Sequence, residues 1–548
     1  MVKFKRGHLY YPEIPVHRIL EDTAKRFPNN PAFLYPINLS FKQFKEQVDI
    51  FATALNNLGV KKGDRVALYA PNSIPWEISF FGLEKAGAIL VPMNPQFKEN
   101  EVEYEANDSG AYTIIVSQKE YPYVAKIRNR TDFKNVIIIE SEKESETPEG
   151  TIGWSDLIKN TKPNPPEYHF NAKEDLAALV YTSGTTGLPK GTMLTHFNMV
   201  SNIIQVSPTF ELGEFDVAMI VLPLYHIYGL NVAMNQAIWL GAAQVVLPRF
   251  KVKEFCELIE KCKVTYSLCV PPIFLEVVRH LENPNIKGYN WENLKIFNNG
   301  AAPIPLELLD RFDKLAKEKC NAKDATIQHG WGLTEASPVV AVNPMFRRKM
   351  ESQGTLLSDT FHKIIDLETG KELPERGQIG ELVIKGPQVM KGYWNRPKAT
   401  EEAFWTDPET GEKWLRTGDM AYIDEEEYEH LMDRIKEMIK YKGWSIAPAE
   451  LEDLLFKNPH VFDAAVIGKP SKELDIGQIP KAFIVLKKES KGKVTEQEIM
   501  IWVAERISAY KKIREVEFID SIPKSGSGKI LHRELVEMEK KRLEFQKN

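Results

Sequence analysis

The first half of the chain alternates segments with a helical spacing of apolar residues and short, continuous apolar runs. Apolar residues over 48–58 recur with the period of an amphipathic helix, and the run 64–70 has the length and composition of a buried strand. A helix over 76–86 and a strand over 88–93 repeat this order. Strands that alternate with helices predict an α/β fold of stacked layers with parallel sheets. Further strands are predicted over 112–117, 135–140, 177–183, 243–248 and 294–300.

The pattern changes twice in the second half of the chain. After about residue 346, Gly and Pro separate short apolar segments, which predicts a β-rich, more antiparallel subdomain at about 346–432. From residue 434 onward, Lys and Glu predominate between short helix-like and strand-like segments. We therefore expect a large N-terminal domain over 1–432 and a small, mobile α+β C-terminal domain over 433–548, joined by a hinge at 433–436.

Composition and charge exclude several classes of protein. The 548 residues are 43% hydrophobic and 27% charged, which is ordinary for a globular protein and argues against disorder, collagen and a coiled-coil rod. A net charge of -5 leaves no overall positive field for nucleic acid. The uncharged stretch 217–248 is long enough to cross a membrane, but Pro223, His226 and several amides interrupt it, so we expect it to form buried core.

The four cysteines predict neither a disulfide framework nor a zinc site, because their spacing contains no CxxC pair. We interpret Cys256, Cys262 and Cys269 as core thiols. The first residues lack the continuous apolar core of a secretory signal. We therefore expect a cytoplasmic protein without a transmembrane segment, and the sequence leaves open whether it forms a homodimer.

A segment rich in Ser, Thr and Gly directly follows the apolar run 176–180. It reads YTSGTTGLPKG over 181–191. Small hydroxylated residues after a strand let backbone N–H groups and hydroxyls converge on an anion, and Lys190 adds a positive charge. The alternative is a flexible surface turn, which does not require this composition. Counting GxxxxGK from Gly184 places Pro189 where glycine is required, so the segment predicts a phosphate-binding loop of a type other than Walker A.

Seven further segments follow this loop in the chain. They are LPLYHIYGL (222–230), NNGAAPIP (298–305), HGWGLTEAS (329–337), GELVIKGPQVMKGYW (380–394), WLRTGD (414–419), DRIKEMIKYKGWSIAPAELE (433–452) and IPKSGSGKILHREL (522–535). Together the eight segments resemble, in order, the motifs of the adenylate-forming superfamily, which includes acyl-CoA synthetases, 4-coumarate-type ligases, luciferase and peptide-synthetase adenylation domains. The resemblance implies an AMP-forming acyl-CoA ligase that uses ATP, Mg²⁺ and coenzyme A.

The resemblance also implies roles for individual residues. Lys529 is expected to bridge the substrate carboxylate and the α-phosphate, where negative charge gathers in the transition state. Glu335 and Thr182 resemble a magnesium-contacting pair, and Asp419, supported by Arg434, should accept hydrogen bonds from the ribose hydroxyls. Trp331 takes the position of the residue that stacks on adenine. The other residues implied at the nucleotide are Ser183, Gly184, Thr185, Thr186, Gly187, Lys190, Gly300, Ala301, Ala302, Pro303, His329, Gly330, Gly332 and Thr334.

Two residues bear on the identity of the acid. By resemblance, His226 faces the acid pocket, and we expect it to line that pocket rather than to act as a base. Gly332 follows the adenine-stacking position, and its missing side chain is expected to leave space for an acid longer than acetate. The sequence therefore predicts a medium-chain fatty acid, with a short hydroxy acid such as 4-hydroxybutyrate as the alternative.

The C-terminal domain is expected to act as a lid that rotates between the two half-reactions. Lys436 is the predicted pivot. The rotation would withdraw Lys529 and bring in Lys440, a catalytic residue of the second step, with Gly443 leaving a path for pantetheine. Three other functions stay open at this level: an amino-acid-activating domain, a luciferase-like oxidative enzyme and an inactive acyl-AMP-binding relative.

Overall fold

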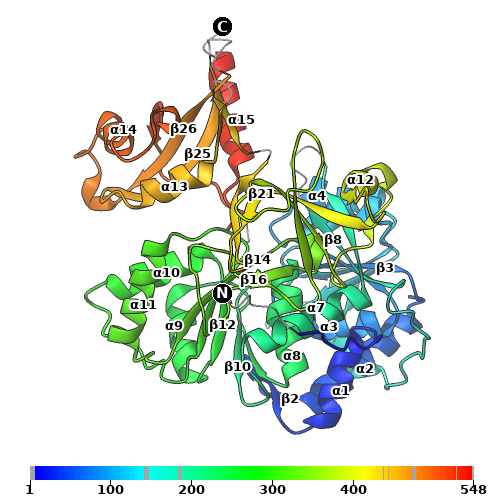
Figure 1. The fold of residues 1–548 in the computed structure, drawn as a ribbon. Coiled ribbons are helices and arrows are strands. Elements are labelled where there is room, and N and C mark those ends of the chain that lie inside the picture. Colours follow the sequence, from blue (N-terminus) through cyan, green and yellow to red (C-terminus); the bar gives the residue numbers. More distant parts are fainter. Residues whose placement is uncertain are drawn as a thin grey trace.

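Two large sheets form the body of the N-terminal domain (Figure 1). The computed structural model describes residues 7–140, 147–182, 188–435, 437–441, 444–471, 477–525 and 528–545. The eight-stranded sheet has the order β19 (Gly392–Tyr393), β9 (Lys190–Thr195), β8 (Leu176–Thr182), β4 (Ile89–Pro92), β3 (Arg65–Tyr69), β5 (Thr113–Ser117), β6 (Asn135–Ile139), β7 (Ile152–Gly153). The nine-stranded sheet has the order β16 (Thr355–Leu356), β15 (Val339–Val342), β14 (Thr326–Gly332), β13 (Ile296–Asn299), β12 (Tyr266–Cys269), β10 (Val217–Ile220), β11 (Ala243–Val246), β1 (Pro31–Tyr35), β2 (Leu39–Ser40).

The strands in the middle of both sheets are parallel, and antiparallel strands extend their edges. Helices connect these strands, as the alternating apolar pattern predicts. The helices of this domain are α1 (His17–Arg26), α2 (Phe41–Asn57), α3 (Ile74–Lys85), α4 (Glu99–Ser109), α5 (Tyr121–Ile127), α6 (Trp154–Asn160), α7 (His196–Val206), α8 (Gln236–Leu240), α9 (Val252–Lys261), α10 (Pro271–Glu282), α11 (Leu306–Cys320) and α12 (Pro397–Glu402). The other helix types are the 3-10 helices η1 (Arg128–Arg130), η2 (Ser207–Thr209) and η4 (Thr334–Ala336) and the π-helix η3 (Tyr228–Asn235).

A five-stranded antiparallel sheet follows and leads to the C-terminal domain, drawn in orange and red above α10 and α11 in Figure 1. Its strands are β17 (Phe361–Ile365), β18 (Gly380–Lys385), β20 (Phe404–Thr406), β21 (Lys413–Ile423) and β22 (Glu429–Arg434). The C-terminal domain packs helices on a three-stranded sheet. Its elements are β23 (Ile439–Tyr441), β24 (Trp444–Ile446), α13 (Pro448–Phe456), β25 (Val461–Pro470), β26 (Gln478–Leu486), η5 (Lys488–Ser490), α14 (Glu496–Ala504), η6 (Ala509–Lys511), β27 (Glu515–Phe518) and α15 (His532–Phe545).

The predicted α/β class is confirmed, and every strand predicted above has a counterpart within a few residues. One clear difference is the start of α2, which begins at Phe41 instead of residue 48. Ser40 Oγ accepts a hydrogen bond from the Gln43 N–H at 3.2 Å, and Gln43 Oε1 accepts the Ser40 N–H at 2.9 Å. This capping box starts the helix two turns before its apolar period becomes evident.

The uncharged stretch 217–248 is core, as predicted. It forms β10, η3, α8 and β11, most of whose residues are buried. In the part of the chain that the structure describes, no helix combines the length and apolar character needed to cross a membrane. Cys256 and Cys269 are buried free thiols, as expected, whereas Cys262 is only partly buried because it caps the exposed end of α9.

Candidate active site

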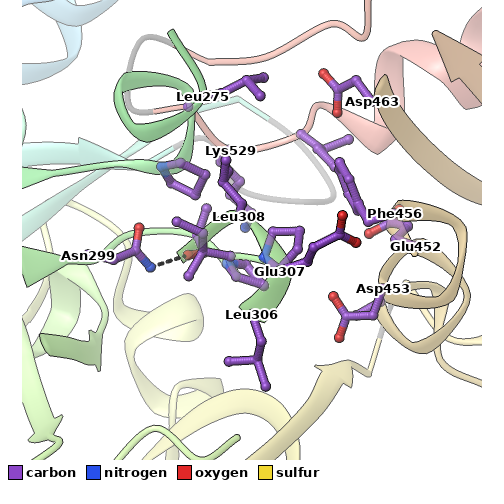
Figure 2. Close-up of a pocket in the computed structure, with 18 of the residues that line it drawn as sticks. Leu275, Asn299, Leu306, Glu307, Leu308, Glu452, Asp453, Phe456, Asp463 and Lys529 are labelled. Atoms are coloured by element: carbon purple, nitrogen blue, oxygen red, sulfur yellow. Dashed lines mark hydrogen bonds between the residues drawn. The ribbon is translucent and has the colours of Figure 1, made fainter. Parts of the chain in front are cut away.

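A cavity of about 1290 Å³ lies between the C-terminal domain and one end of the nine-stranded sheet (Figure 2). The carboxyl ends of the parallel strands β13 and β14 open into it, which is where ligands of α/β sheets bind. Helices α10, α11 and α13, strands β21, β22 and β25 and the loop before α15 form its other walls. Of the residues implied at the nucleotide, the cavity brings together Ala301, Ala302, Pro303, His329, Gly330, Trp331, Gly332, Asp419, Arg434 and Lys529.

Asp419 and Arg434 are register partners in the β21–β22 pair. Arg434 Nε lies 2.7 Å from Asp419 Oδ1, and Arg434 Nη1 donates to the Thr417 carbonyl at 2.8 Å. The other carboxylate oxygen, Asp419 Oδ2, is buried without a hydrogen-bond partner among the described residues. An unsatisfied buried acceptor is costly, and a ribose hydroxyl is a donor of the kind that would satisfy it.

Burial also changes the acidity of this carboxyl group. It raises the pKa of Asp419 to about 6, although the positive charges of Arg434 and Lys529 oppose the shift. The group is therefore anionic at neutral pH and becomes protonated in mild acid. The opposing effect of Lys529 indicates that its ammonium lies close enough to act electrostatically on Asp419 in this arrangement of the two domains.

Lys529 extends into the cavity from the loop before α15 (Figure 2). Its backbone N–H donates to Ser525 Oγ at 3.1 Å. The preceding Gly528 has φ +80°, and a Cβ at this position would lie 2.6 Å from Pro272 Cδ at the start of α10. Glycine is therefore needed both for the turn and for the close approach of the loop to the N-terminal domain. This is how SGSGK brings its lysine to the cavity.

Gly300 lies against the aromatic ring of Tyr228. It does not line the cavity of Figure 2, and a Cβ there would lie 2.7 Å from the ring of Tyr228. Tyr228 Oη donates in turn to Asn298 Oδ1 at 2.7 Å. Gly300 therefore makes room for the Tyr228 ring. Ala301 and Ala302, directly after it, do line the cavity.

The expectation that Gly332 leaves space for the acid is wrong. Gly332 lines the cavity, but a Cβ on it would lie 2.0 Å from the Pro338 carbonyl oxygen and 3.0 Å from Val339 Cα. That carbonyl accepts the Leu333 N–H at 2.9 Å where β14 turns back toward β15. The space beside Gly332 is filled by backbone, so this glycine permits the close pairing of the two strands.

Thr182 and Lys190 are register partners at the end of the β8–β9 hairpin. Glu335, in η4, accepts a hydrogen bond from Tyr393 Oη at 2.8 Å, and Lys190 Nζ lies 5.1 Å from the centre of the Tyr393 ring. Tyr393 therefore connects Lys190 with Glu335. The described residues that line the cavity do not include Thr182, Lys190, Thr334 or Glu335. Seven implicated residues lie outside the described part of the chain: Ser183, Gly184, Thr185, Thr186, Gly187, Lys436 and Gly443.

The oxygen atoms near this hairpin fit a magnesium ion that arrives with ATP. Within the described ranges, no group of three or more His, Cys, Asp or Glu side chains could hold a metal by itself. The Glu335 carboxylate, oriented by Tyr393, and the Thr182 hydroxyl are hard oxygen donors. Mg²⁺ bound mainly by phosphate oxygens requires only one or two such protein ligands.

His226 and Lys440 lie outside the cavity. Burial lowers the pKa of His226 to about 4, so its ring is neutral at physiological pH. His226 Nδ1 accepts the Tyr228 N–H at 3.2 Å, which leaves the proton on Nε2. Lys440, on β23, is exposed, and its backbone N–H donates to Gln478 Oε1 at 2.9 Å.

Two cavity residues, Glu437 and His532, were missed at the sequence level. His532 Nε2 lies 2.8 Å from Glu452 Oε1, and its Nδ1 lies 3.3 Å from Glu437 Oε2. Burial alone would lower the pKa of His532, but its interactions with these two glutamates raise it to about 10. Both residues stand inside recognised motifs, DRIKE and KILHREL, yet only the folded chain shows that they meet.

Comparison with known proteins gives the family. The AMP-binding enzyme family matches residues 20–394, and the AMP-binding enzyme C-terminal domain matches residues 450–529. The chain therefore belongs to the AMP-binding, adenylate-forming enzymes, as its motifs predict. Within this superfamily it is an AMP-forming acyl-CoA ligase with ATP and coenzyme A as substrates.

Three relatives illustrate the similarity. A 4-coumarate:CoA ligase of Petunia hybrida is 36% identical over 547 residues, covering 97% of this chain and 95% of that protein. A 4-coumarate--CoA ligase of Pinus taeda is 38% identical, covering 95% of this chain and 94% of that protein. The crystal structure of a long-chain-fatty-acid-CoA ligase from Archaeoglobus fulgidus superposes with a TM-score of 0.74 at 36% identity, covering 94% and 99% of the two chains.

Proposed function

We propose that this ligase activates a medium-chain fatty acid in the cavity between its two domains. In the first half-reaction, a carboxylate oxygen of the acid attacks the α-phosphorus of ATP, and the bond to pyrophosphate breaks. In the second, the thiolate of coenzyme A attacks the acyl carbon, and AMP leaves. The observation that carries the proposal is the meeting of Lys529, Arg434 and the unsatisfied Asp419 oxygen in one cavity.

Each residue has a distinct role in the first half-reaction. Lys529 holds the carboxylate against the α-phosphate and stabilises the charge that gathers between them. Asp419 Oδ2 accepts a ribose hydroxyl, and Trp331 stacks on adenine. Thr182 and Glu335 would hold Mg²⁺ together with the phosphates. When bound, the ion neutralises the charge that pyrophosphate carries away.

The chain of the acid is proposed to extend beyond the residues that line the cavity, toward a wall formed by His226 and Tyr228. A site that selects a hydroxylated acid keeps an unpaired polar group for that hydroxyl. Here the buried Tyr228 hydroxyl already donates to Asn298, and the His226 ring carries no charge. This uncharged wall suits an apolar acyl chain, whereas a hydroxylated acid would have to pair with the His226 Nε2–H.

Two other acid classes are the alternatives. One is a short hydroxy acid such as 4-hydroxybutyrate, which would need an additional polar partner in the pocket. The other is an aromatic acid, which the two 4-coumarate ligases named above support. The fatty acid ligase of Archaeoglobus fulgidus supports the apolar chain at a comparable sequence identity.

Pyrophosphate exchange and thioester formation, measured over a panel of acids, test this proposal. The panel contains acetate, hexanoate, octanoate, 4-hydroxybutyrate and 4-coumarate, each with and without coenzyme A. We expect the highest kcat/KM with hexanoate or octanoate. A higher value with 4-hydroxybutyrate or 4-coumarate would overturn the assigned acid while leaving the ligase activity intact. If the protein binds ATP but catalyses pyrophosphate exchange with no acid of this or a wider panel, it is an inactive relative.

The two-domain organisation is also part of the proposal. We place the boundary at 432/433 and the hinge at 433–436, with Lys436 as pivot and with Lys440 and Gly443 serving the second half-reaction. Strand β22 continues through Arg434, so the first residues of the proposed hinge are still paired with the five-stranded sheet in this arrangement. We further propose a cytoplasmic location, and mass measurement on the purified protein distinguishes a monomer from a homodimer.

A further inference from the structure

Helix α4 holds both described ends of the phosphate-loop hairpin. The Tyr181 hydroxyl, one residue before the end of β8, donates to Asp108 Oδ2 at 2.8 Å. The Tyr104 hydroxyl donates to the carbonyl of Pro189, directly before β9, at 2.7 Å. The rings of Tyr104 and Tyr181 also meet edge to face, with centroids 6.4 Å apart. One helical turn of α4 thus contacts the chain where it enters and where it leaves the loop.

Asp108 joins a third segment to this hairpin. Its Oδ1 accepts from Arg396 Nη2 at 2.5 Å, and its backbone carbonyl accepts from Trp394 Nε1 at 3.2 Å. Trp394 in turn donates its backbone N–H to the Gly191 carbonyl, on β9, at 2.8 Å. The Asp108 side chain is 10% exposed, so these contacts are shielded from solvent. Both of its carboxylate oxygens are therefore committed to protein partners.

The third segment also reaches Glu335. Tyr393, next to Trp394, pairs with Thr192 of β9. Its hydroxyl donates a hydrogen bond to Glu335, and the Lys190 ammonium lies over its ring. The positions of Lys190 and Glu335 therefore depend on how firmly 391–396 is fixed against the hairpin. Asp108 provides that fixation from the opposite side through Arg396 and Trp394.

We propose that Asp108 is a positioning residue for the polyphosphate of ATP. It touches no substrate and acts through Tyr181 on Thr182, and through Arg396 and Trp394 on Lys190 and Glu335. This inference rests on the proposed roles of those three residues in phosphate and magnesium binding. Side chains that are already held in position bind a polyanion without a further cost of ordering. If the hydrogen bonds that hold them are lost, binding of the nucleotide weakens more than binding of the other substrates.

The alternative is that the network only stabilises the fold. Burial and the hydrogen bond to Asp108 hold the pKa of Tyr181 above its usual range, so its hydroxyl is a permanent donor at working pH. A purely structural hydrogen bond would change the melting temperature but leave the substrate preferences of the folded enzyme unchanged. A positioning role raises the KM for ATP selectively.

Tyr181→Phe tests the proposal, with Tyr112→Phe as the matched control. Both remove one tyrosine hydroxyl that donates to an aspartate, but Tyr112 donates to Asp64, which directly precedes strand β3 and takes no part in the hydrogen bonds described above. We expect Tyr181→Phe to raise the KM for ATP in pyrophosphate exchange by about 5- to 10-fold, as loss of one charge-assisted hydrogen bond implies. The KM for coenzyme A should stay within twofold, and Tyr112→Phe should leave both constants unchanged.

Asp108→Ala and Asp108→Asn extend the test. Asp108→Ala should raise the KM for ATP by at least 10-fold, and Asp108→Asn should recover part of this loss because its amide oxygen still accepts from Arg396. Equal ATP constants in wild type, Tyr181→Phe and Asp108→Asn, each verified as folded, would overturn the positioning role. So would a uniform rise in the KM of all three substrates. Wild-type exchange activity tests the proposed function separately.

Discussion

The two carboxylate oxygens of Asp419 have different surroundings. Arg434 holds Oδ1, while Oδ2 is buried without a partner among the described residues, and burial raises the pKa of the group to about 6. Because the folded pKa lies above the ordinary value of 3.8, the folded protein binds this proton more tightly than the unfolded chain does. The contribution of Asp419 to stability therefore decreases as the pH rises from about 4 to about 6.

The same pKa predicts a pH dependence of nucleotide binding. Protonation below about pH 6 removes the charged acceptor, and charge-assisted hydrogen bonds are roughly twice as strong as neutral ones. The KM for ATP should rise several-fold between pH 7.5 and pH 5.5, as measured by pyrophosphate exchange. Asp419→Asn, which is neutral throughout, should have a higher KM at pH 7.5 and a flat profile over this range. A variant profile as steep as that of the wild type would assign the pH dependence to another group.

Lys529 is the charge on which the first half-reaction should depend most. Lys529→Ala should lower the rate of acyl-AMP formation by about 10²- to 10³-fold, the usual cost of removing one preorganised electrostatic donor. Thioester formation from synthetic acyl-AMP and coenzyme A should fall much less. Lys491→Ala is the control, because Lys491 is an exposed lysine of the same domain that pairs with Asp520. Equal losses in both half-reactions would refute the assigned role.

At the scale of secondary-structure elements, the β14–β15 connection determines what a residue at position 332 can do. Gly332→Ala should lower the free energy of unfolding by about 1 to 3 kcal/mol, because the added Cβ would collide with the Pro338 carbonyl. That carbonyl cannot move away unless β15 loses its register with β14. Chemical denaturation measures this cost. Gly213→Ala is the matched control, since nothing lies within 4 Å of a Cβ there.

The activity of the folded Gly332→Ala protein completes this test. Its preference for acid chain length should be the same as that of the wild type, because the added methyl points into backbone and not into the acid pocket. A stable variant with a clear shift toward acetate would show that the β14–β15 connection yields and that position 332 limits the pocket after all.

The elements themselves could be predicted because each has a local cause. Continuous apolar runs became buried strands, and the uncharged stretch 217–248 became core. Neighbours in a local motif, such as Gly528 and Lys529 in SGSGK, line the same cavity. Contacts between distant segments could not be predicted. The carbonyl of Pro338 beside Gly332, and the meeting of His532 with Glu437, depend on strand register and domain packing, which no local pattern encodes.

At the scale of the whole molecule, the two domains meet in an arrangement that holds Lys529 in the cavity between them. Arg279 of α10 places its guanidinium 3.4 Å from the centre of the Phe462 ring on β25, and Gly528 packs on Pro272. These contacts keep Lys529 in the cavity, whereas Lys440 is exposed and lies outside it. Because coenzyme A transfer is proposed to use Lys440, the C-terminal domain has to change its orientation between the two steps.

Lys436→Pro should separate the half-reactions. Proline fixes φ near -65° and restricts the preceding residue, so a hinge at this position can no longer rotate freely. Acyl-AMP formation, followed as pyrophosphate release in a single turnover, should stay within a few-fold of the wild type, because it needs only the arrangement described above. Transfer of the acyl group to coenzyme A should fall by at least about 10-fold, since it requires rotation.

Lys436→Ala removes the same side chain but keeps the backbone free, so it should retain both steps. If Lys436→Ala loses acyl transfer to coenzyme A as severely as Lys436→Pro does, the Lys436 side chain is needed for transfer and the backbone is not the cause. If Lys436→Pro loses both half-reactions equally, the pivot lies at another residue.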